Sequence, residues 1–229
     1  MLLYILEVTY MKYKSVFWDW NGTLLNDAAA SWLAVNDMLC ARNLPLITFE
    51  KYREYIDVPI IRFYERVMDV SKEDMEKLSL EFNSFCAKHL PADPLQNGAR
   101  EILEALKNLG IRQHIYSSSH VKYILPVLDS LGISSYFEAV LGANDVLAGS
   151  KAERTKKYLE ENGILPEDSL FVGDLVHDNE VASYIGSECV LVTLGHQPKN
   201  ILLNTGSKVI DDLTELDKYF KNNSSEVEK

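Results

Sequence analysis

Short apolar runs alternate with helix-like periodicity along most of the chain. Each run ends in a polar residue or a glycine; the runs are Ser15–Trp18, His114–Tyr116, Ala139–Leu141, Leu170–Val172 and Val190–Leu194. Residues 97–109 place Ile102, Leu103 and Leu106 on one helical face before Gly110, and residues 152–162 predict another helix before Gly163. Buried strands separated by helices are typical of a parallel sheet covered on both faces. The pattern therefore predicts an α/β fold in three layers.

Residues 28–90 have a different hydrophobic pattern, with helical periods and no convincing strand. They predict about four helices, interrupted by Pro45 and Pro59 and closed by the linker residues 91–94. We therefore predict an all-helical cap, residues 28–92, inserted after the first strand of a Rossmann-like core made of residues 14–27 and 93–221. An insertion at this point would lie over the carboxyl ends of the strands, where such sheets bind ligands. Residues 1–13 are predicted as an N-terminal extension, with Met11 a second candidate start, and residues 222–229 as a frayed tail.

Polar residues follow three of the apolar runs. Asp19 ends the first run, Ser117 follows the second, and Asp174 follows the fourth with Asp178 four residues later. Lys151 stands in a short segment after Gly149, between the second and third of these positions. If the strands are parallel, all of these side chains meet at one edge of the sheet. Carboxylates, a hydroxyl and a cation gathered there predict a site for Mg²⁺ and a phosphoryl group.

From Lys14 to about Leu216 the chain resembles the haloacid dehalogenase-like hydrolase superfamily, and within it the phosphoglycolate-phosphatase-like branch with a helical cap. The first motif of the family, DxDGT, is present as DWNGT at residues 19–23. The hydroxyl motif falls on Ser117 and the lysine motif on Lys151. The acidic motif GDxxxD is present as GDLVHD at residues 173–178, and the VLVTLGHQ sequence that follows also resembles this branch. The order and spacing of four motifs carry the resemblance.

The resemblance implies a phosphatase that works through an aspartyl-phosphate. Asp19 would be the nucleophile, and Lys151 would neutralise the charge that it shares with the phosphoryl group. Asp19, the backbone carbonyl of Asn21 and Asp174 would bind Mg²⁺, and Asp178 would hold the water shell of the metal or orient Lys151.

The same resemblance assigns the binding of the phosphate group. Ser117 and the backbone amides at Asn21 and Gly22 would bind the oxygens that do not react, with Thr23 and Ser118 beside them. The run of three serines leaves open which hydroxyl faces the site. His120 and His177 flank two of the motifs, and we expect both to be partly exposed and to take no part in the chemistry.

Asn21 departs from the family pattern. Phosphatases of the family usually have an aspartate here, which gives a proton to the leaving alcohol and later takes one from water. An amide cannot transfer a proton in this way, and such help is worth about 10²–10⁴ in rate. The sequence therefore leaves open a slow or specialised phosphatase, a phosphotransferase or C–P bond hydrolase, and a phosphate-binding regulatory protein that has lost catalysis. The retention of Asp19, Lys151 and Asp174 favours an enzyme.

Composition narrows the partners and the compartment. The 34 acidic residues outnumber the 23 basic ones, and this net charge of -11 argues against non-specific binding to nucleic acid. No apolar stretch has the roughly 20 residues of a membrane span. Three scattered cysteines, Cys40, Cys86 and Cys189, fit a reducing compartment. We therefore expect a cytoplasmic protein that acts on a small phosphorylated metabolite.

Overall fold

The computed structural model describes residues 12–143 and 150–220, which form one six-stranded sheet with the strand order β3-β2-β1-β4-β5-β6. All neighbouring strands are parallel, as the α/β prediction requires. The strands are β1 Ser15–Trp18, β2 Arg112–His120, β3 Ala139–Ala143, β4 Ser169–Gly173, β5 Glu188–Val192 and β6 Lys208–Ile210. The predicted tail and nearly all of the predicted N-terminal extension lie outside the described residues.

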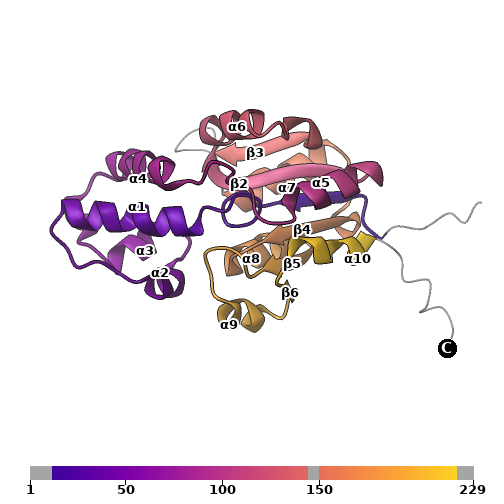
Figure 1. The fold of residues 1–229 in the computed structure, drawn as a ribbon. Coiled ribbons are helices and arrows are strands. Elements are labelled where there is room, and N and C mark those ends of the chain that lie inside the picture. Colours follow the sequence, from indigo (N-terminus) through magenta and orange to yellow (C-terminus); the bar gives the residue numbers. More distant parts are fainter. Residues whose placement is uncertain (1–11, 144–149, 221–229) are drawn as a thin grey trace, which may run out of the picture.

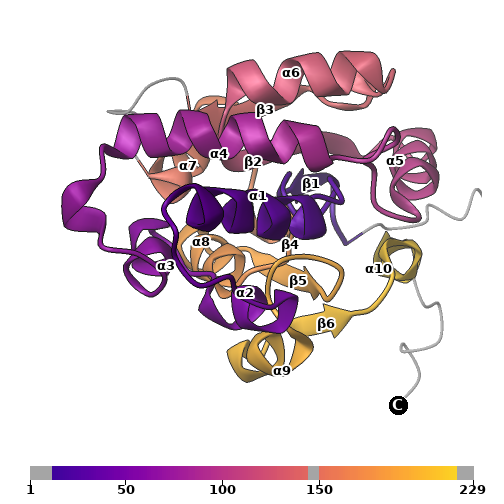
Figure 2. The same ribbon diagram turned by 60° about the vertical axis from the view of Figure 1, so that its left-hand side comes forward.

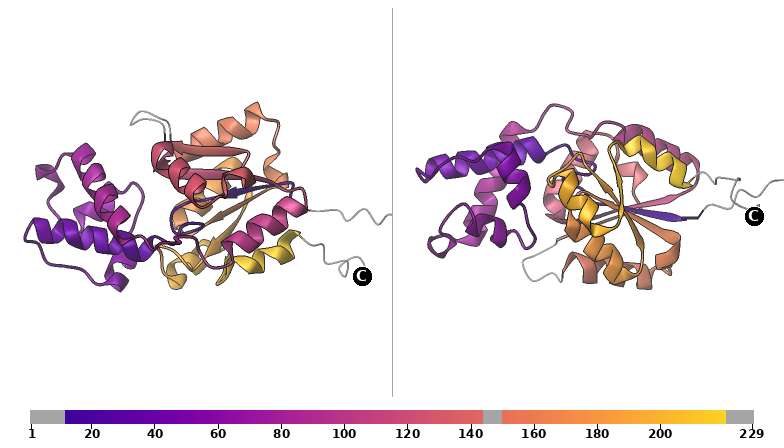
Figure 3. Two further views of the ribbon diagram at one scale, coloured as in Figure 1. Left: turned by 45° about the horizontal axis from the view of Figure 1, so that its top comes forward. Right: turned by 90° about the horizontal axis from the view of Figure 1, so that it is seen from below.

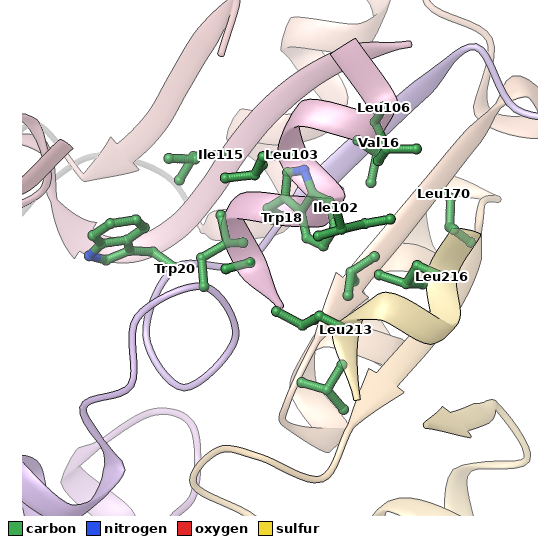
Figure 4. Packing of buried hydrophobic residues seen from close by; sticks show 14 of the residues in the cluster. Val16, Trp18, Trp20, Ile102, Leu103, Leu106, Ile115, Leu170, Leu213 and Leu216 are labelled. Carbon is green, nitrogen blue, oxygen red and sulfur yellow. The ribbon is translucent and has the colours of Figure 1, made fainter. Parts of the chain in front are cut away.

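Helices cover both faces of the sheet because successive strand side chains point to opposite sides. Val16 and Trp18 of β1 pack on one face with α5 Ala99–Asn108, α6 Val121–Ser130 and α10 Asp217–Phe220. Phe17 packs on the other face with α7 Lys151–Glu161 and α8 Val176–Ile185. The short helix α9 Lys199–Leu202 precedes β6. Figure 3 shows the layers, and Figure 4 shows the apolar packing around Trp18.

Four helices lie between β1 and α5 in the chain, and Figure 1 shows them together at one end of the molecule. In Figure 2 this end is turned toward the viewer. The four helices are α1 Ala28–Ala41, α2 Phe49–Tyr55, α3 Ile61–Glu65 and α4 Met75–His89. We call residues 28–89 the helical insertion. It has an apolar cluster of its own, made of Val35, Met38, Leu39, Tyr52, Phe63, Tyr64, Met68 and Leu78. This cluster gives the insertion a core separate from that of the sheet.

Two strands differ from the sequence prediction. We predicted that the second apolar run ends at Tyr116, but β2 continues to His120. That prediction was wrong because a run of serines resembles a turn, whereas here the pairing with β3 only shifts its register between Tyr116 and His120. β6 was not predicted at all, because its three residues are too few to show a period.

Among the helices of residues 12–143 and 150–220, none has both the length and the apolar character that a membrane span requires.

Candidate active site

The side chain that ends β1 meets a lysine from α7. The backbone N–H of Asp19 donates to the carbonyl of Val172 in β4, which places Asp19 beside the acidic residues that follow β4. Lys151 Nζ donates to Asp19 Oδ1 at 2.5 Å and to Asp178 Oδ1 at 2.7 Å. It also lies 3.9 Å from the centre of the Tyr116 ring. The lysine is buried and its charge is held by two carboxylates, so it is no solvated surface residue.

Three carboxylates gather around this lysine. Asp19, Asp174 and Asp178 each offer one oxygen, and these oxygens all lie within 4.8 Å of one another. Burial raises the pKa of Asp19 well above its ordinary value; Lys151 opposes this rise, and the other two carboxylates add to it. Burial also raises the pKa of Asp174 to about 6. One lysine therefore leaves the cluster short of positive charge, and a hard divalent cation with oxygen ligands fits it.

Lys151 stays protonated in these surroundings. Burial alone would lower its pKa, but Asp178 and Asp19 outweigh that effect and raise the pKa to about 12. Asp178 does more than pair with the lysine, because its Oδ2 accepts the backbone N–H groups of Asp174 and Leu175 at 3.1 and 3.0 Å. Asp178 thus joins the start of α8 to the lysine at the start of α7.

Two glycines allow the backbone to approach Asp174. Gly22 has φ +75°, and a Cβ there would lie 2.3 Å from Asp174 Oδ2. A Cβ on Gly195 would lie 2.1 Å from the same oxygen. Both positions therefore require glycine, Gly22 for its left-handed conformation as well as for space. The second approach lets the neighbouring His196 donate its backbone N–H to Asp174 Oδ2 at 2.6 Å.

The amide of Asn21 is held at both ends. Its Nδ2 donates to Asp27 Oδ2 at 2.7 Å, and its Oδ1 accepts the hydroxyl of Ser119 at 2.6 Å. The N–H of Gly22 also donates to Asp27, at 2.8 Å. An aspartate at position 21 would face Asp27 as a like charge, whereas asparagine supplies the donor that Asp27 accepts. The structure therefore gives the amide a positive role that its departure from the family pattern did not reveal.

Sequence reasoning missed Asp27 and His196. Both are buried, and His196 Nε2 lies 3.3 Å from Asp27 Oδ1. Burial would raise the pKa of Asp27 and lower that of His196, but the pair outweighs burial, so the Asp27 pKa is lowered and the His196 pKa rises to about 9. Asp27 reads in the sequence as the N-cap of α1, although its side chain caps no helix N–H. The signal for His196 was a polar residue just after β5, at the same sheet edge as Asp19.

The same segment after β5 supports the helical insertion. Tyr52 Oη of α2 lies 2.7 Å from His196 Nδ1. Arg53 donates to the carbonyls of Thr193 and Gln197 at 3.1 and 2.6 Å, and Gln197 donates to the carbonyl of Ile56 at 3.3 Å. Helix α2 is therefore attached to the sheet by polar contacts next to the carboxylate cluster.

The Asp27–His196 pair predicts how stability depends on pH. The folded-state pKa of His196 lies above its ordinary 6.5, so the contribution of the pair is complete below about pH 6.5 and is lost as the pH rises through about 9. We expect the free energy of unfolding in EDTA to fall by up to about 3 kcal/mol more across this window in the natural protein than in His196→Gln. Urea unfolding at a series of pH values measures this difference.

Asp27→Asn serves as the second arm of that experiment, because it removes the same pair from the other side. Both variants should show the same flattened profile, and their double variant should be no flatter than either one. Profiles that run parallel to that of the natural protein would show that the pair is not charged in solution.

A cavity of about 480 Å³ brings most of the predicted residues together. Asp19, Asn21, Ser117, Ser118 and Lys151 all line it. All three serines of the run line the cavity, although Ser117 Oγ also accepts the N–H of Ser119 at 3.1 Å. The predicted metal-binding carboxylates that do not line it are fully buried beside Asp19; they are Asp174 and Asp178.

Two residues that the resemblance assigned to substrate binding, Gly22 and Thr23, lie outside the cavity. The N–H of Gly22 is directed to Asp27, and the hydroxyl of Thr23 donates to Asp174 Oδ1 at 3.3 Å. Both residues thus donate hydrogen bonds to buried carboxylates instead of lining the cavity. His177 lines the cavity and pairs with Glu180 at 3.2 Å. His120 does not line it and accepts the backbone N–H of Lys122 instead.

Comparison with known proteins places this site in a family. Residues 16–192 match the family model described as haloacid dehalogenase-like hydrolase. The phosphoglycolate phosphatase of Haemophilus influenzae is 28% identical over 218 residues, covering 90% of this chain and 97% of that protein. Phosphoglycolate phosphatase 1 of Pseudomonas aeruginosa is 26% identical over 214 residues, covering 89% of this chain and 78% of that protein.

Solved structures show the same fold. A haloacid dehalogenase-like family hydrolase from Streptococcus pneumoniae superimposes with a TM-score of 0.79 at 19% identity, covering 91% of this chain and 99% of that one. A predicted phosphoglycolate phosphatase from Haemophilus somnus gives a TM-score of 0.75 at 22% identity, covering 90% and 96%. The match extends over both the sheet and the helical insertion, because it covers nine tenths of the chain.

Proposed function

The chain belongs to the haloacid dehalogenase-like hydrolase family, and from this premise we propose that it is a metal-dependent phosphatase acting on a small phosphorylated metabolite. The observation that carries the proposal is the 2.5 Å contact between Lys151 and Asp19, beside two further buried carboxylates and at the wall of a cavity. The contact sets a carboxylate nucleophile next to a fixed positive charge. This is the arrangement that attack on a phosphate group needs.

In the proposed reaction, an oxygen of Asp19 attacks phosphorus in line with the leaving group. The bond from phosphorus to the leaving oxygen breaks, and an aspartyl-phosphate forms on Asp19. Water then attacks the phosphorus of this acyl phosphate and loses a proton to solvent. The bond from phosphorus to the Asp19 oxygen breaks, which releases inorganic phosphate and restores the carboxylate. Lys151 holds the orientation of Asp19 in both steps, and its charge offsets that of the phosphoryl oxygens.

The serines at the end of β2 are the proposed partners of the phosphoryl oxygens. Ser117 and Ser118 line the cavity together with Asp19, and their hydroxyl groups can donate to an anion. The N–H of Gly22, which already donates to Asp27, takes no part in this proposal.

The metal would be Mg²⁺, held by Asp19, the backbone carbonyl of Asn21 and Asp174. Mg²⁺ favours a few carboxylates and keeps several waters, which suits this set of oxygens. When bound, it supplies a Lewis acid that polarises a phosphoryl oxygen. Asp178 accepts the ammonium of Lys151 through Oδ1 and the N–H of Leu175 through Oδ2, so we assign it to the orientation of Lys151.

Removal of the metal gives the direct test. We expect EDTA to abolish the release of phosphate from acetyl phosphate and excess Mg²⁺ to restore it. Asp174→Asn should weaken the apparent affinity for Mg²⁺ in a titration of activity, because one of the three carboxylates is lost. Asp129→Asn, which changes an exposed aspartate in the last turn of α6, is the matched control. Full activity of the metal-free protein would contradict the proposal.

We also propose that the helical insertion is a cap over the active site. We assign residues 28–92 to the cap and residues 14–27 with 93–221 to the catalytic core, because the insertion supplies one side of the cavity and the strand ends supply the other. A protein that only binds phosphate would release none from acetyl phosphate, and a phosphotransferase would need an added acceptor. The same assay therefore separates these alternatives.

A further inference from the structure

The helical insertion contributes more than half of the residues that line the cavity. The core contributes the reacting end, with Asp19, Asn21, Lys151 and the serines of β2. The insertion surrounds the remaining space, where the leaving group of a phosphate ester bound at Asp19 would lie. Its side chains therefore define the chemistry of that leaving group.

Apolar side chains dominate the part of the cavity that belongs to the insertion. Val35, Phe63 and Tyr64 are buried in the apolar cluster of the insertion, and all three line the cavity. Ile60 and Met75 also line it, and they leave 45% and 40% of their surface exposed. Large apolar side chains that are exposed beside a cavity mark a surface that an apolar ligand covers.

The charged side chains of the insertion also favour an uncharged leaving group. Among the described residues of the insertion, no lysine or arginine lines the cavity, and Asp57 is the one acidic side chain that does. Asp57 already pairs with Arg66 at 3.1 Å and with Arg62 at 3.8 Å, and neither arginine is among the lining residues. A carboxylate or second phosphate on the leaving group would thus lose its water without gaining a cation there.

Asn21 adds an independent argument. Its amide cannot protonate a departing alkoxide, because Nδ2 donates to Asp27 and Oδ1 accepts the hydroxyl of Ser119. The carboxyl group of Asp27 is in turn paired with His196. A phenol leaves as a stable anion and needs little protonation. The missing acid and the apolar cavity wall therefore favour the same kind of substrate.

We propose that the substrate is a phosphate ester of an uncharged, largely apolar alcohol, with an aromatic alcohol of the phenol class as the best fit, and not an ester that carries a second anion such as phosphoglycolate. This inference rests on the proposed phosphatase activity. It departs from the substrate in the names of the relatives, because those names describe proteins with at most 28% identity in the alignments above.

A matched pair of substrates tests the cavity apart from the chemistry of the leaving group. Benzyl phosphate and phosphoglycolate are both esters of primary alcohols, so neither has the advantage of a phenol. We expect kcat/KM for benzyl phosphate to exceed that for phosphoglycolate by about 10- to 100-fold, the factor expected from burial of one apolar group of this size. Phenyl phosphate should be faster than both. Preference for phosphoglycolate, or for phosphocholine with its cationic tail, would overturn the inference.

A substitution at the exposed rim adds a cation to the insertion side of the cavity, where no described lysine or arginine lies. Ile60→Arg should raise kcat/KM for phosphoglycolate by about tenfold and lower it for benzyl phosphate, because the new guanidinium can pair with the carboxylate. Leu46→Arg is the matched control, since Leu46 is 62% exposed and does not line the cavity. An unchanged ratio of the two substrates in Ile60→Arg would show that this wall does not select the leaving group.

Acetyl phosphate separates failure of this inference from failure of the proposed function. It has a good leaving group and no large apolar part, so it reports on the reacting end of the site alone. Hydrolysis of acetyl phosphate together with a preference for phosphoglycolate would contradict the substrate class and leave the phosphatase intact. No release of phosphate from any of these esters in Mg²⁺ would contradict the phosphatase itself.

Discussion

Asp19→Asn is expected to lower kcat for phosphate release by a factor on the order of 10⁴ or more while leaving the fold intact. The amide has the shape of the carboxylate but cannot attack phosphorus, so the covalent step is lost. The fold should survive because Asp178 Oδ1 still accepts a hydrogen bond from Lys151 at 2.7 Å and balances its charge. The measurement is the steady-state rate with acetyl phosphate, together with the thermal unfolding curve of each protein.

Rapid quenching in acid adds a direct reading of the intermediate. During turnover, the natural protein should carry a phosphoryl group on the peptide that contains Asp19, and the variant should carry none. Asp129→Asn again serves as the control for the loss of one surface charge. Retention of most of the activity in Asp19→Asn would mean that another group attacks phosphorus, or that water does so directly.

Asn21→Asp is expected to raise kcat for alkyl phosphates by up to about 10²–10⁴ and to change the hydrolysis of aryl and acyl phosphates far less. The new carboxyl group would supply the proton that an alkoxide needs, whereas a phenolate or carboxylate leaves without one. Benzyl phosphate and p-nitrophenyl phosphate are suitable members of the two classes. The affinity for Mg²⁺ should stay the same, because in the proposed site position 21 would hold the metal through its backbone carbonyl.

The structure adds a condition to this experiment. The amide of Asn21 donates to Asp27 at 2.7 Å, so the substituted aspartate would face a carboxylate at hydrogen-bond distance. Two carboxyl groups this close share a proton, which keeps one of them protonated at a higher pH than usual. That state suits a general acid, although the repulsion lowers stability. The double variant Asn21→Asp with Asp27→Asn restores a hydrogen bond between an amide and a carboxylate and shows how much of the change depends on the shared proton.

A failure of Asn21→Asp on alkyl esters, with metal binding intact, would mean that another group already supplies the proton. His196 is then the first candidate, since it lines the cavity and pairs with Asp27. His177 also lines the cavity but pairs with an exposed glutamate, and His120 does not line it. The expectation from sequence concerned only His120 and His177, so it overlooked His196.

The local pattern of the chain was enough to predict most of the fold. The apolar runs at β1 and β4 identified buried strands, because a strand with both faces covered must be apolar along its length. The run at β3 identified a partly buried strand at the edge of the sheet. The hydrophobic pattern of residues 28–90 predicted helices and no strand, and this segment contains the helices α1 to α4. The parallel sheet then follows from the alternation of strands and helices. From a parallel sheet it follows in turn that Asp19, Lys151 and Asp174 belong to one edge.

Tertiary structure decided which polar groups work together. Asn21 stands six residues before Asp27, and nothing in that spacing shows that its amide donates to Asp27 while accepting the hydroxyl of Ser119 from β2. Likewise, Tyr52 of the insertion meets His196, which lies 144 residues away in the chain. Local periodicity contains no information about such pairs.

The physical reason is that the two kinds of information act over different distances. Burial and backbone geometry act on each residue and its neighbours in the chain, so the sequence by itself determined the strands, the helical insertion and the order of Asp19, Lys151 and Asp174. The charge and hydrogen bonding of a buried side chain depend on whatever the fold brings within a few ångströms of it. The ion pair of Asp27 with His196 and the bonding of Asn21 were therefore decided only when the strand ends came together. The apolar wall of the cavity was decided only when the helical insertion packed against those strand ends.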